Sequence, residues 1–231
     1  MVLRLSDHRK AGTLASEFRR RRLAFFWDAL QVNETTRILD IGGTLDFWRN
    51  MAIRGKITVL NVGAPPSDAV PGCEYVPGDA RDLSQYGDGV FDVAFSNSVI
   101  EHVGSRRYQE AMARNVRRVC QRYFVQTPNR HFIIEPHFVF PCFQFLPPFV
   151  RTMIARHWPY GWYEPGSAQS LCEALSLRML SCSQLAGLFP DAVIIGERFL
   201  GLNKSLMAIR SPTAFSGFPG LKVLREPGQA E

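Results

Sequence analysis

The sequence contains no uninterrupted apolar segment long enough to cross a membrane. A membrane-spanning helix needs about 20 mostly apolar residues. The most apolar stretch, residues 138–150, is shorter and is interrupted by three prolines. The first ten residues have no apolar core like that of a secretory signal, so we expect a cytoplasmic protein.

Cysteine is scarce and has no metal-binding pattern. The chain has five cysteines, an odd number, and no two of them have the C-x-x-C spacing. Zinc sites and disulfide frameworks both need regular cysteine patterns. We therefore expect reduced cysteines, most of them in the core, in a cytosolic protein.

The composition is that of one soluble, basic domain. Apolar residues make up 46% of the 231 residues and charged residues 21%. The formal net charge is +6, and the excess is local: arginines fill positions 19–22 and recur across 106–122. A basic face can contact a nucleic acid, an anionic membrane or an acidic small molecule, although most such faces are simply solvated.

Short apolar strands alternate with amphipathic helices over the first half of the chain. This order predicts a Rossmann-like, doubly wound α/β fold with a mostly parallel sheet. The polar residues that follow each strand then meet at one edge, where such folds bind ligands. The predicted strands are 36–41, 57–62, 73–77, 90–95 and 122–126, and the predicted helices are 13–30, capped by Thr13, 45–52 and 105–119.

The alternation stops after the fifth strand. Residues 129–166 are rich in aromatics and prolines and predict a lid insertion with a short helix at 149–157. Helices at 168–176 and 183–189 follow, and then two strands, 193–199 and 204–210, that form an antiparallel hairpin. We expect a seven-stranded sheet in one domain over 1–210, and a flexible tail over 211–231.

Polar residues and glycines follow the first three strands. Gly42 and Gly43 allow a sharp turn close to a ligand, and Asp40 precedes them as a partner for an amino group. Asn61 ends the second strand and can bond ribose hydroxyls, although it can also serve as a turn residue. Asp79 follows the third strand and can accept from an adenine amine.

The ordered segments RILDIGG, ITVLNV, GDARDL, FDVAFSNSVIEHV and YFVQTPNR resemble a class I methyltransferase that uses S-adenosylmethionine (SAM). The resemblance is to the small type 11 and type 23-like enzymes that include the ubiquinone-pathway O-methyltransferases. It implies that SAM is the cofactor and that no metal is required. The residues it assigns to SAM are Asp40, Gly42, Gly43, Thr44, Asn61, Asp79, Ala80 and Asn97.

Glu101 and His102 are the best candidates for acid–base chemistry, because a histidine can accept a hydroxyl proton near neutral pH. Alternatively, Glu101 caps a helix and His102 packs locally. The residues predicted to contact the acceptor come from the lid and are Asn129, His131, Glu135 and His137. A metal site of His131, Glu135 and His137 is conceivable, but their spacing matches no established ligand pattern.

These features predict O-methylation of a small-molecule, lipid-linked or sugar-linked acceptor. RNA methylation is one alternative, but the chain has no NPPY-like motif and no separate RNA-binding module. A non-catalytic SAM-binding scaffold is another, since the glycine turn is short and Asn61 replaces the usual acid. The arginines at 19–22, with Phe25, Phe26 and Trp27, also suggest a peripheral contact with an anionic membrane.

Overall fold

The computed structural model describes residues 13–49, 51–212 and 218–228. A sheet with strand order β10-β8-β9-β5-β4-β1-β2-β3 forms its centre. Strands β1 to β5 are parallel, and β9, β8 and β10 continue the sheet antiparallel. The five parallel strands are β1 (Arg37–Ile41), β2 (Lys56–Asn61), β3 (Cys73–Pro77), β4 (Phe91–Asn97) and β5 (Cys120–Pro128).

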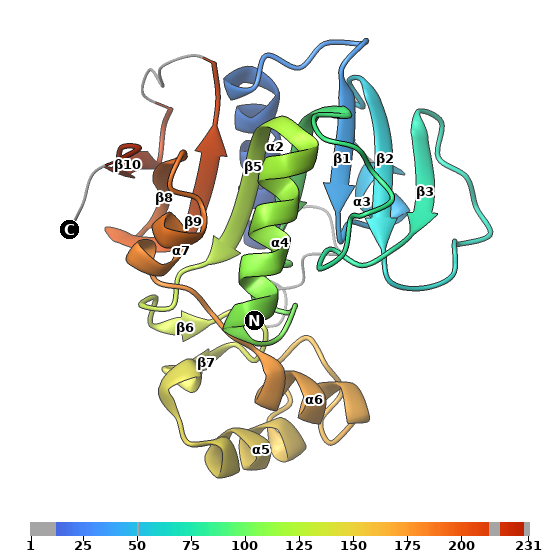
Figure 1. Ribbon diagram of the computed structural model, residues 1–231. Helices are drawn as coiled ribbons and strands as arrows, with labels where there is room; N and C mark the ends of the chain where they lie inside the picture. The colour runs from blue at the N-terminus through green and yellow to red at the C-terminus, as the bar shows by residue number, and fades with distance from the viewer. Residues whose placement is uncertain (1–12, 50, 213–217, 229–231) are drawn as a thin grey trace.

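Helices cover both faces of this sheet, as the alternating pattern predicts. In Figure 1, α4 (Arg106–Val119) and α7 (Cys182–Leu188) lie in front of the sheet and α2 (Leu14–Ala29) lies behind it. The side chains of β1 alternate between two cores: Leu39 packs in the cluster with α4, and Ile38 packs in the cluster with α2. The predicted doubly wound fold is therefore confirmed.

The antiparallel end of the sheet is larger than predicted. Strands β8 (Val193–Phe199) and β9 (Leu202–Arg210) form the expected hairpin, but β10 (Leu221–Arg225) pairs with the outer side of β8. The sheet thus has eight strands in the described residues instead of seven. The predicted flexible tail over 211–231 is wrong for residues 221–225, because the edge of β8 offers free backbone groups that this segment satisfies.

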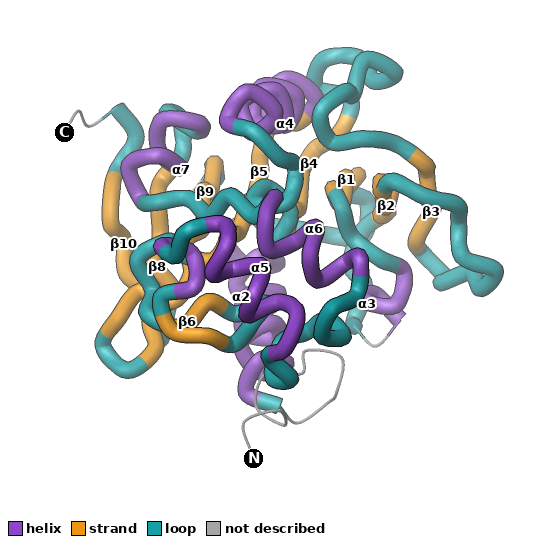
Figure 2. The backbone as a smooth tube through the Cα atoms, turned by 90° about the horizontal axis from the view of Figure 1, so that it is seen from below, coloured by secondary structure: helices purple, strands orange, loops and turns teal. Residues whose placement is uncertain are grey.

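The residues after β5 form a small cap below the carboxyl ends of the parallel strands. Figures 1 and 2 show this cap from the front and from below. Its apolar core includes Phe138, Phe143 and Ala174, so α6 belongs to it and the cap extends beyond the predicted limit of residue 166. Its elements are β6 (Ile134–Glu135), β7 (Phe140–Pro141), η1 (Phe143–Phe145), α5 (Pro148–His157) and α6 (Ala168–Ser176).

The N-terminal helix α2 packs into the main core. Thr13 caps it, as predicted, since its hydroxyl accepts from the Ser16 amide at 3.1 Å. Phe25, Phe26 and Trp27 are 3%, 0% and 7% exposed, so these side chains are not available for the membrane contact proposed from the sequence. None of the helices in the described ranges combines the length and apolar character needed to cross a bilayer.

A buried carboxyl group fixes the turn after β1. Asp40 is 1% exposed and lies on the face of β1 that packs against α3 (Leu45–Arg49), a helix shorter than predicted. The Trp48 indole donates to its Oδ2 at 2.6 Å. Burial raises the pKa of Asp40 to about 7, and the indole hydrogen bond opposes this only in part.

The raised pKa of Asp40 predicts how stability changes with pH. In the unfolded chain this group releases its proton near pH ~3.9, so the folded protein binds the extra proton between that pH and about 7. The stabilisation is complete at low pH and is lost as the pH rises through the folded pKa. We expect Asp40→Asn to gain up to about 4 kcal/mol of unfolding free energy relative to the wild type between pH 4 and pH 8.

Urea titrations at pH 4, 6 and 8 would measure this difference. Asp68→Asn is the matched control, because the Asp68 side chain is 72% exposed and its substitution should give a flat difference. Parallel pH profiles for Asp40→Asn and the wild type would contradict the raised pKa.

Candidate functional site

A cleft of about 330 Å³ opens at the carboxyl ends of β1, β2 and β4, beside the loop that follows β3. This is the edge where doubly wound sheets bind ligands, and the volume suits a small molecule. The cleft unites five of the residues predicted from the sequence. Its lining residues are Gly42, Leu60, Asn61, Val62, Gly78, Asp79, Ala80, Arg81, Ser98, Val99, His102 and Val103.

The glycine turn is required by its own neighbours in the fold. Gly42 has a φ of +73°, and a Cβ there would lie 2.6 Å from the side chain of Val99. A Cβ at Gly43 would lie 1.7 Å from the carboxylate of Asp40. A side chain at Gly43 would therefore disturb the fold itself, whether or not a ligand is bound.

Asn61 closes the same turn from β2. Its amide nitrogen donates to the Gly43 carbonyl at 2.7 Å, and its oxygen accepts from the Val62 amide at 2.7 Å. The side chain lines the cleft, so a ribose contact remains open to it. Its first observed role is to fix the glycine turn, which explains why an amide can stand where an acid is usual: a carboxylate cannot donate to a carbonyl.

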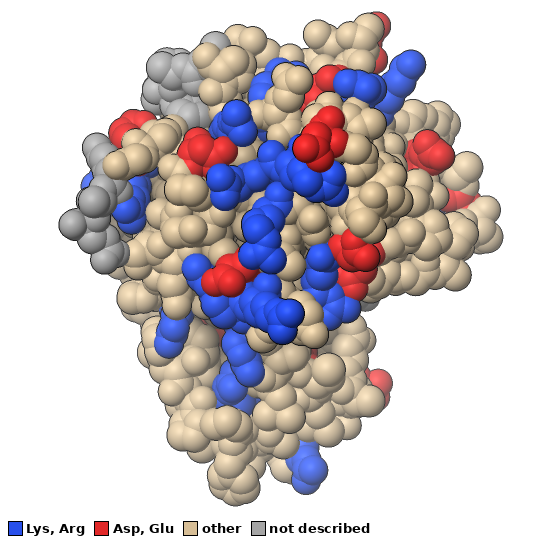
Figure 3. All heavy atoms as spheres, in the orientation of Figure 1, with Lys and Arg blue, Asp and Glu red and all other residues tan. Residues whose placement is uncertain are grey.

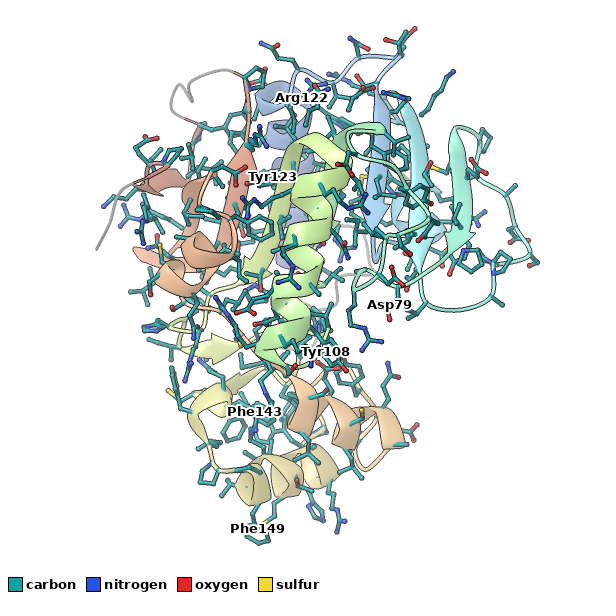
Figure 4. All side chains as sticks on the ribbon, in the orientation of Figure 1. Asp79, Tyr108, Arg122, Tyr123, Phe143 and Phe149 are labelled. Carbon is teal, nitrogen blue, oxygen red and sulfur yellow. The ribbon has the colours of Figure 1, made fainter. Side chains whose placement is uncertain are left out.

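Asp79 lies at the far side of the cleft. The Arg81 guanidinium binds its carboxylate at 2.8–2.9 Å and holds the pKa of Asp79 below its usual value. Arg81 in turn stacks over the Tyr108 ring at 4.8 Å. Figure 4 shows Asp79 near the carboxyl ends of β2 and β3 and Tyr108 at the adjoining end of α4. Asp79 is thus a fixed acceptor at the rim of the cleft, next to the buried Ala80.

Four residues that the resemblance assigns to SAM, Gly43 and three others, do not line the cleft as the described residues form it. Asp40 points to the α3 side of β1, and contact with an amino group would require the turn to move. Thr44 is exposed, and its hydroxyl accepts from the Phe47 amide at the start of α3. Asn97 ends β4, half-buried, opposite Gln126 of β5.

The lining still fits SAM. The bare backbone at Gly42 and Gly78 allows close approach, and the amide of Asn61 and the carboxylate of Asp79 are groups that can hydrogen-bond a nucleoside. Leu60, Val99 and Val103 give the apolar surface that a nucleobase needs. A polar set of this kind on an apolar wall is the usual form of a cofactor site.

Glu101 and His102 lie where the cleft meets the cap. Glu101 is 0% exposed; its Oε2 accepts from the Thr127 hydroxyl at 2.9 Å, and its backbone carbonyl accepts from the Arg178 amide at 2.9 Å. The predicted alternative for Glu101, a helix cap, is not observed: Ser105 precedes α4. Glu101, which follows β4, instead forms hydrogen bonds to β5 and to the segment that leads from the cap back to the sheet.

His102 is held between carboxylates. Its Nδ1 lies 2.6 Å from Glu173 of α6, and its Nε2 lies 3.8 Å from Glu101 Oε1. Burial alone would lower the pKa of His102, but Glu173, Glu101 and Glu135 outweigh it and raise the pKa to about 8. At neutral pH these carboxylates therefore favour a positive charge at this point.

The cap contributes a second histidine to the same place. Glu135 and His137 are both 0% exposed, and His137 Nδ1 lies 2.5 Å from Glu135 Oε1. The His137 ring meets the rings of His102 and Trp162 edge-on, with centroids 4.7 Å apart in each case. The prediction that the cap brings Glu135 and His137 to the Glu101–His102 pair agrees with this geometry.

Asn129 and His131 have other positions. The Asn129 side chain donates to the Asn203 carbonyl at 2.8 Å and accepts from the His131 amide, so it anchors the start of the cap. His131 is exposed, and its ring lies 6.3 Å from that of Phe145. The predicted grouping of His131 with Glu135 and His137 is therefore wrong, because β6 turns the chain inward only after His131.

Two members of the cluster were not found from the sequence. Glu173 lies on a helix whose pattern is ordinary, and Thr127 lies inside the fifth strand. Neither stands in a recognisable motif with Glu101 or His102. The only available signal for Thr127 was its position at the carboxyl end of a predicted strand.

Comparison with known proteins supports the assignment of the fold and activity. Residues 44–123 match a family described as a methyltransferase domain. No curated protein matches the chain.

Several solved structures share the fold at low sequence identity. The PH0226 protein of Pyrococcus horikoshii OT3 is 12% identical, with 90% of this chain and 95% of that chain covered and a TM-score of 0.52. The CurJ carbon methyltransferase is 10% identical, with coverages of 89% and 57% and a TM-score of 0.54. A candidate Zn-dependent alcohol dehydrogenase of Rhodobacter sphaeroides is 8% identical, with coverages of 83% and 88% and a TM-score of 0.57.

These likenesses concern the fold, whereas the match over residues 44–123 concerns the chemistry. It covers the glycine turn's helix, the second to fourth strands and the Glu101–His102 pair. The chain therefore has a Rossmann-like fold in which residues 44–123 are similar to a methyltransferase domain.

Proposed function

We propose that this enzyme methylates a hydroxyl oxygen of a small-molecule, lipid-linked or sugar-linked acceptor, as the resemblance to ubiquinone-pathway O-methyltransferases suggests. One observation carries the proposal: His102, whose neighbours are acidic, lines the same cleft as the cofactor residues Gly42 and Asn61. An acceptor that enters between the cap and the cleft would lie beside both.

Bound SAM supplies a methyl carbon activated by sulfur, so a carbon–oxygen bond forms as the carbon–sulfur bond breaks and its electron pair returns to sulfur. The protein must orient the acceptor oxygen in line and remove its proton. We assign these tasks to Glu101 and His102. Glu101 Oε1 has no hydrogen-bond partner among the described residues, which favours it as the proton acceptor, and His102 would hold the acceptor oxygen.

The surface of the cap favours a lipid-linked acceptor. Phe149 and Met153 are 73% and 50% exposed and lie one turn apart on α5, and Phe145, at the end of the preceding η1, is 52% exposed. Figure 4 shows Phe149 at the tip of the cap, pointing away from the sheet. Exposed apolar side chains next to Arg156 suit the surface of an anionic membrane, the source of such an acceptor.

The basic face of the protein gives less support to RNA methylation. Figure 3 shows a band of basic side chains over the α4 side of the molecule. Three arginines of α4 are already paired with acids: Arg106 with Glu110, Arg117 with Asp191 and Arg118 with Asp88. These pairs lower the charge available to a phosphate backbone.

The first prediction concerns cofactor affinity. Calorimetry should detect S-adenosylhomocysteine binding to the wild type, and Asn61→Ala should weaken it by about tenfold, because the glycine turn loses its side-chain donor and the ribose loses a partner. Asn33→Ala is the matched control, since Asn33 accepts hydrogen bonds at the opposite end of β1. No binding to the wild type at millimolar ligand would refute the site.

The second prediction concerns the acceptor side. With methyl-labelled SAM and a bacterial lipid extract, Glu101→Gln and His102→Ala should each lower label transfer by roughly 10²–10⁴-fold. Their affinity for S-adenosylhomocysteine should change less than about threefold, a change worth well under 1.4 kcal/mol. A wild type that binds cofactor but labels neither lipids nor sugars would favour the non-catalytic scaffold. Equal losses of affinity and transfer would place the pair in the cofactor site.

The third prediction concerns the cap surface. The double variant Phe149→Ser/Met153→Ser should bind anionic phosphatidylglycerol vesicles at least about tenfold more weakly than the wild type in sedimentation, because two apolar anchors are lost. Val90→Ser/Val223→Ser removes partly exposed apolar groups outside the cap and should bind like the wild type. Equal binding by all three proteins would argue against a membrane contact through the cap.

A further inference from the structure

Three ligand atoms meet at the junction of β4 and the cap. They come from Glu101, His102 and His137 and all lie within 4.8 Å of one another. Glu101 and His137 are wholly buried, and His102 is half-buried and borders the cleft. Two imidazoles and one carboxylate are a common ligand set for a divalent transition metal.

A separate partner holds the other polar atom of each of these side chains. His102 Nδ1 lies 2.6 Å from Glu173, and His137 Nδ1 lies 2.5 Å from Glu135. Histidines that bind metals usually donate their second nitrogen to a carboxylate in this way, which fixes the ring and its tautomer. Glu101 Oε2 accepts from Thr127 Oγ1, so Glu101 also has one oxygen left for a ligand.

The free atoms of the two buried side chains are unsatisfied. Within the described residues, Glu101 Oε1 and His137 Nε2 have no hydrogen-bond partner. A buried polar atom without a hydrogen-bond partner destabilises the folded state, so two that lie in one small region call for an explanation. A bound ion would satisfy both atoms at once.

The charges around the cluster also favour a cation. Three carboxylates, those of Glu101, Glu135 and Glu173, surround two imidazoles in a largely buried space. Buried carboxylates need compensating positive charge. A proton on His102 would satisfy the carboxylates on either side of it but would leave His137 Nε2 without an acceptor, whereas a divalent ion would serve all three free atoms.

We infer that Glu101, His102 and His137 form a site for a divalent transition metal ion such as zinc, with Glu135 and Glu173 as the carboxylates that orient its histidines. Zinc binds nitrogen at about 2.0–2.1 Å. Ligand atoms up to 4.8 Å apart must therefore approach by roughly 1 Å. His137 is carried by the cap, so a small shift of the cap toward β4 would supply this movement.

Such an ion would have a task in methyl transfer, and this part of the inference rests on the proposed function. Three protein ligands leave a coordination position open. His102 lines the cleft, so that position would be accessible to an acceptor hydroxyl. A metal ion lowers the pKa of a bound hydroxyl and fixes its orientation, so with the ion bound Glu101 would be a ligand, and the ion would take over the activation of the hydroxyl. This departs from the expectation, drawn from the family resemblance, that no metal is required.

Zinc binding can be tested without SAM or an acceptor. The exposed thiols of Cys142 and Cys172 could bind zinc themselves, so the experiment uses the Cys142→Ser/Cys172→Ser protein after chelator treatment. Calorimetry with zinc chloride should give one ion per chain with a Kd of roughly 1 µM or lower. Cobalt(II) should give visible absorption bands of a four- or five-coordinate nitrogen–oxygen site.

Variants distinguish this site from casual binding. His137→Ala and Glu101→Gln should each weaken zinc binding at least about 100-fold, and Glu135→Gln and Glu173→Gln by about 10–100-fold. His131→Ala and His157→Ala remove exposed histidines of the same cap and should leave binding unchanged. S-adenosylhomocysteine affinity within threefold of the parent protein would show that each variant is folded.

The outcomes separate the metal site from the methyl-transfer proposal. If His137→Ala loses stoichiometric zinc binding and His131→Ala keeps it, the result would support the metal site, even if no lipid or sugar is labelled. The metal site would be overturned if the parent protein bound no stoichiometric zinc. It would also be overturned if His137→Ala still bound S-adenosylhomocysteine and bound zinc as tightly as the parent protein. If His137→Ala fails to fold, Glu101→Gln decides the question, since it keeps the size of the side chain.

Discussion

The burial of Glu101 is the constraint on which the arrangement of this protein depends. Its carboxylate is wholly enclosed, its backbone binds the chain returning from the cap, and its Oε2 accepts from β5. A buried carboxylate must be compensated by hydrogen bonds and positive charge. Thr127 donates a hydrogen bond to this carboxylate. His102 and His137 place two imidazoles near it from separate segments of the chain. The cap is therefore fixed to the sheet by polar chemistry as well as by its apolar core.

Most of the fold could be predicted because it depends on local patterns. The five parallel strands, the hairpin and six of the helices follow from apolar runs, amphipathic spacing and turn residues in the sequence. Strand β10 could not be found in this way. Its sequence is short and lies among prolines and glycines, and it becomes a strand only because the edge of β8 is available. Likewise, α6 was predicted as a helix, but only its packing against Phe138 and Phe143 shows that it belongs to the cap.

The candidate site could be predicted where the topology of the sheet determines it. Gly42, Asn61, Asp79 and His102 meet because parallel strands end at one edge. Side-chain direction could not be predicted. Side chains alternate between the two faces of β1, and Asp40 lies on the face toward α3, where it accepts from Trp48. The amide of Asn61 donates to the Gly43 carbonyl in the glycine turn. Glu173 was missed because its partner, His102, is 71 residues away in the sequence and no spacing rule relates a helix in a cap to a loop after a strand.

His102 links the sheet to the cap. One side of its ring borders the cofactor cleft, and the other is bound to Glu173 in the cap. Any movement of α6 must therefore move this ring or separate its Nδ1 from the Glu173 carboxylate, which lies 2.6 Å away. The ring of His137, which the cap also carries, lies edge-on to that of His102, with the centroids 4.7 Å apart. Glu173 and His137 therefore both link the position of the cap to that of the ring that borders the cleft.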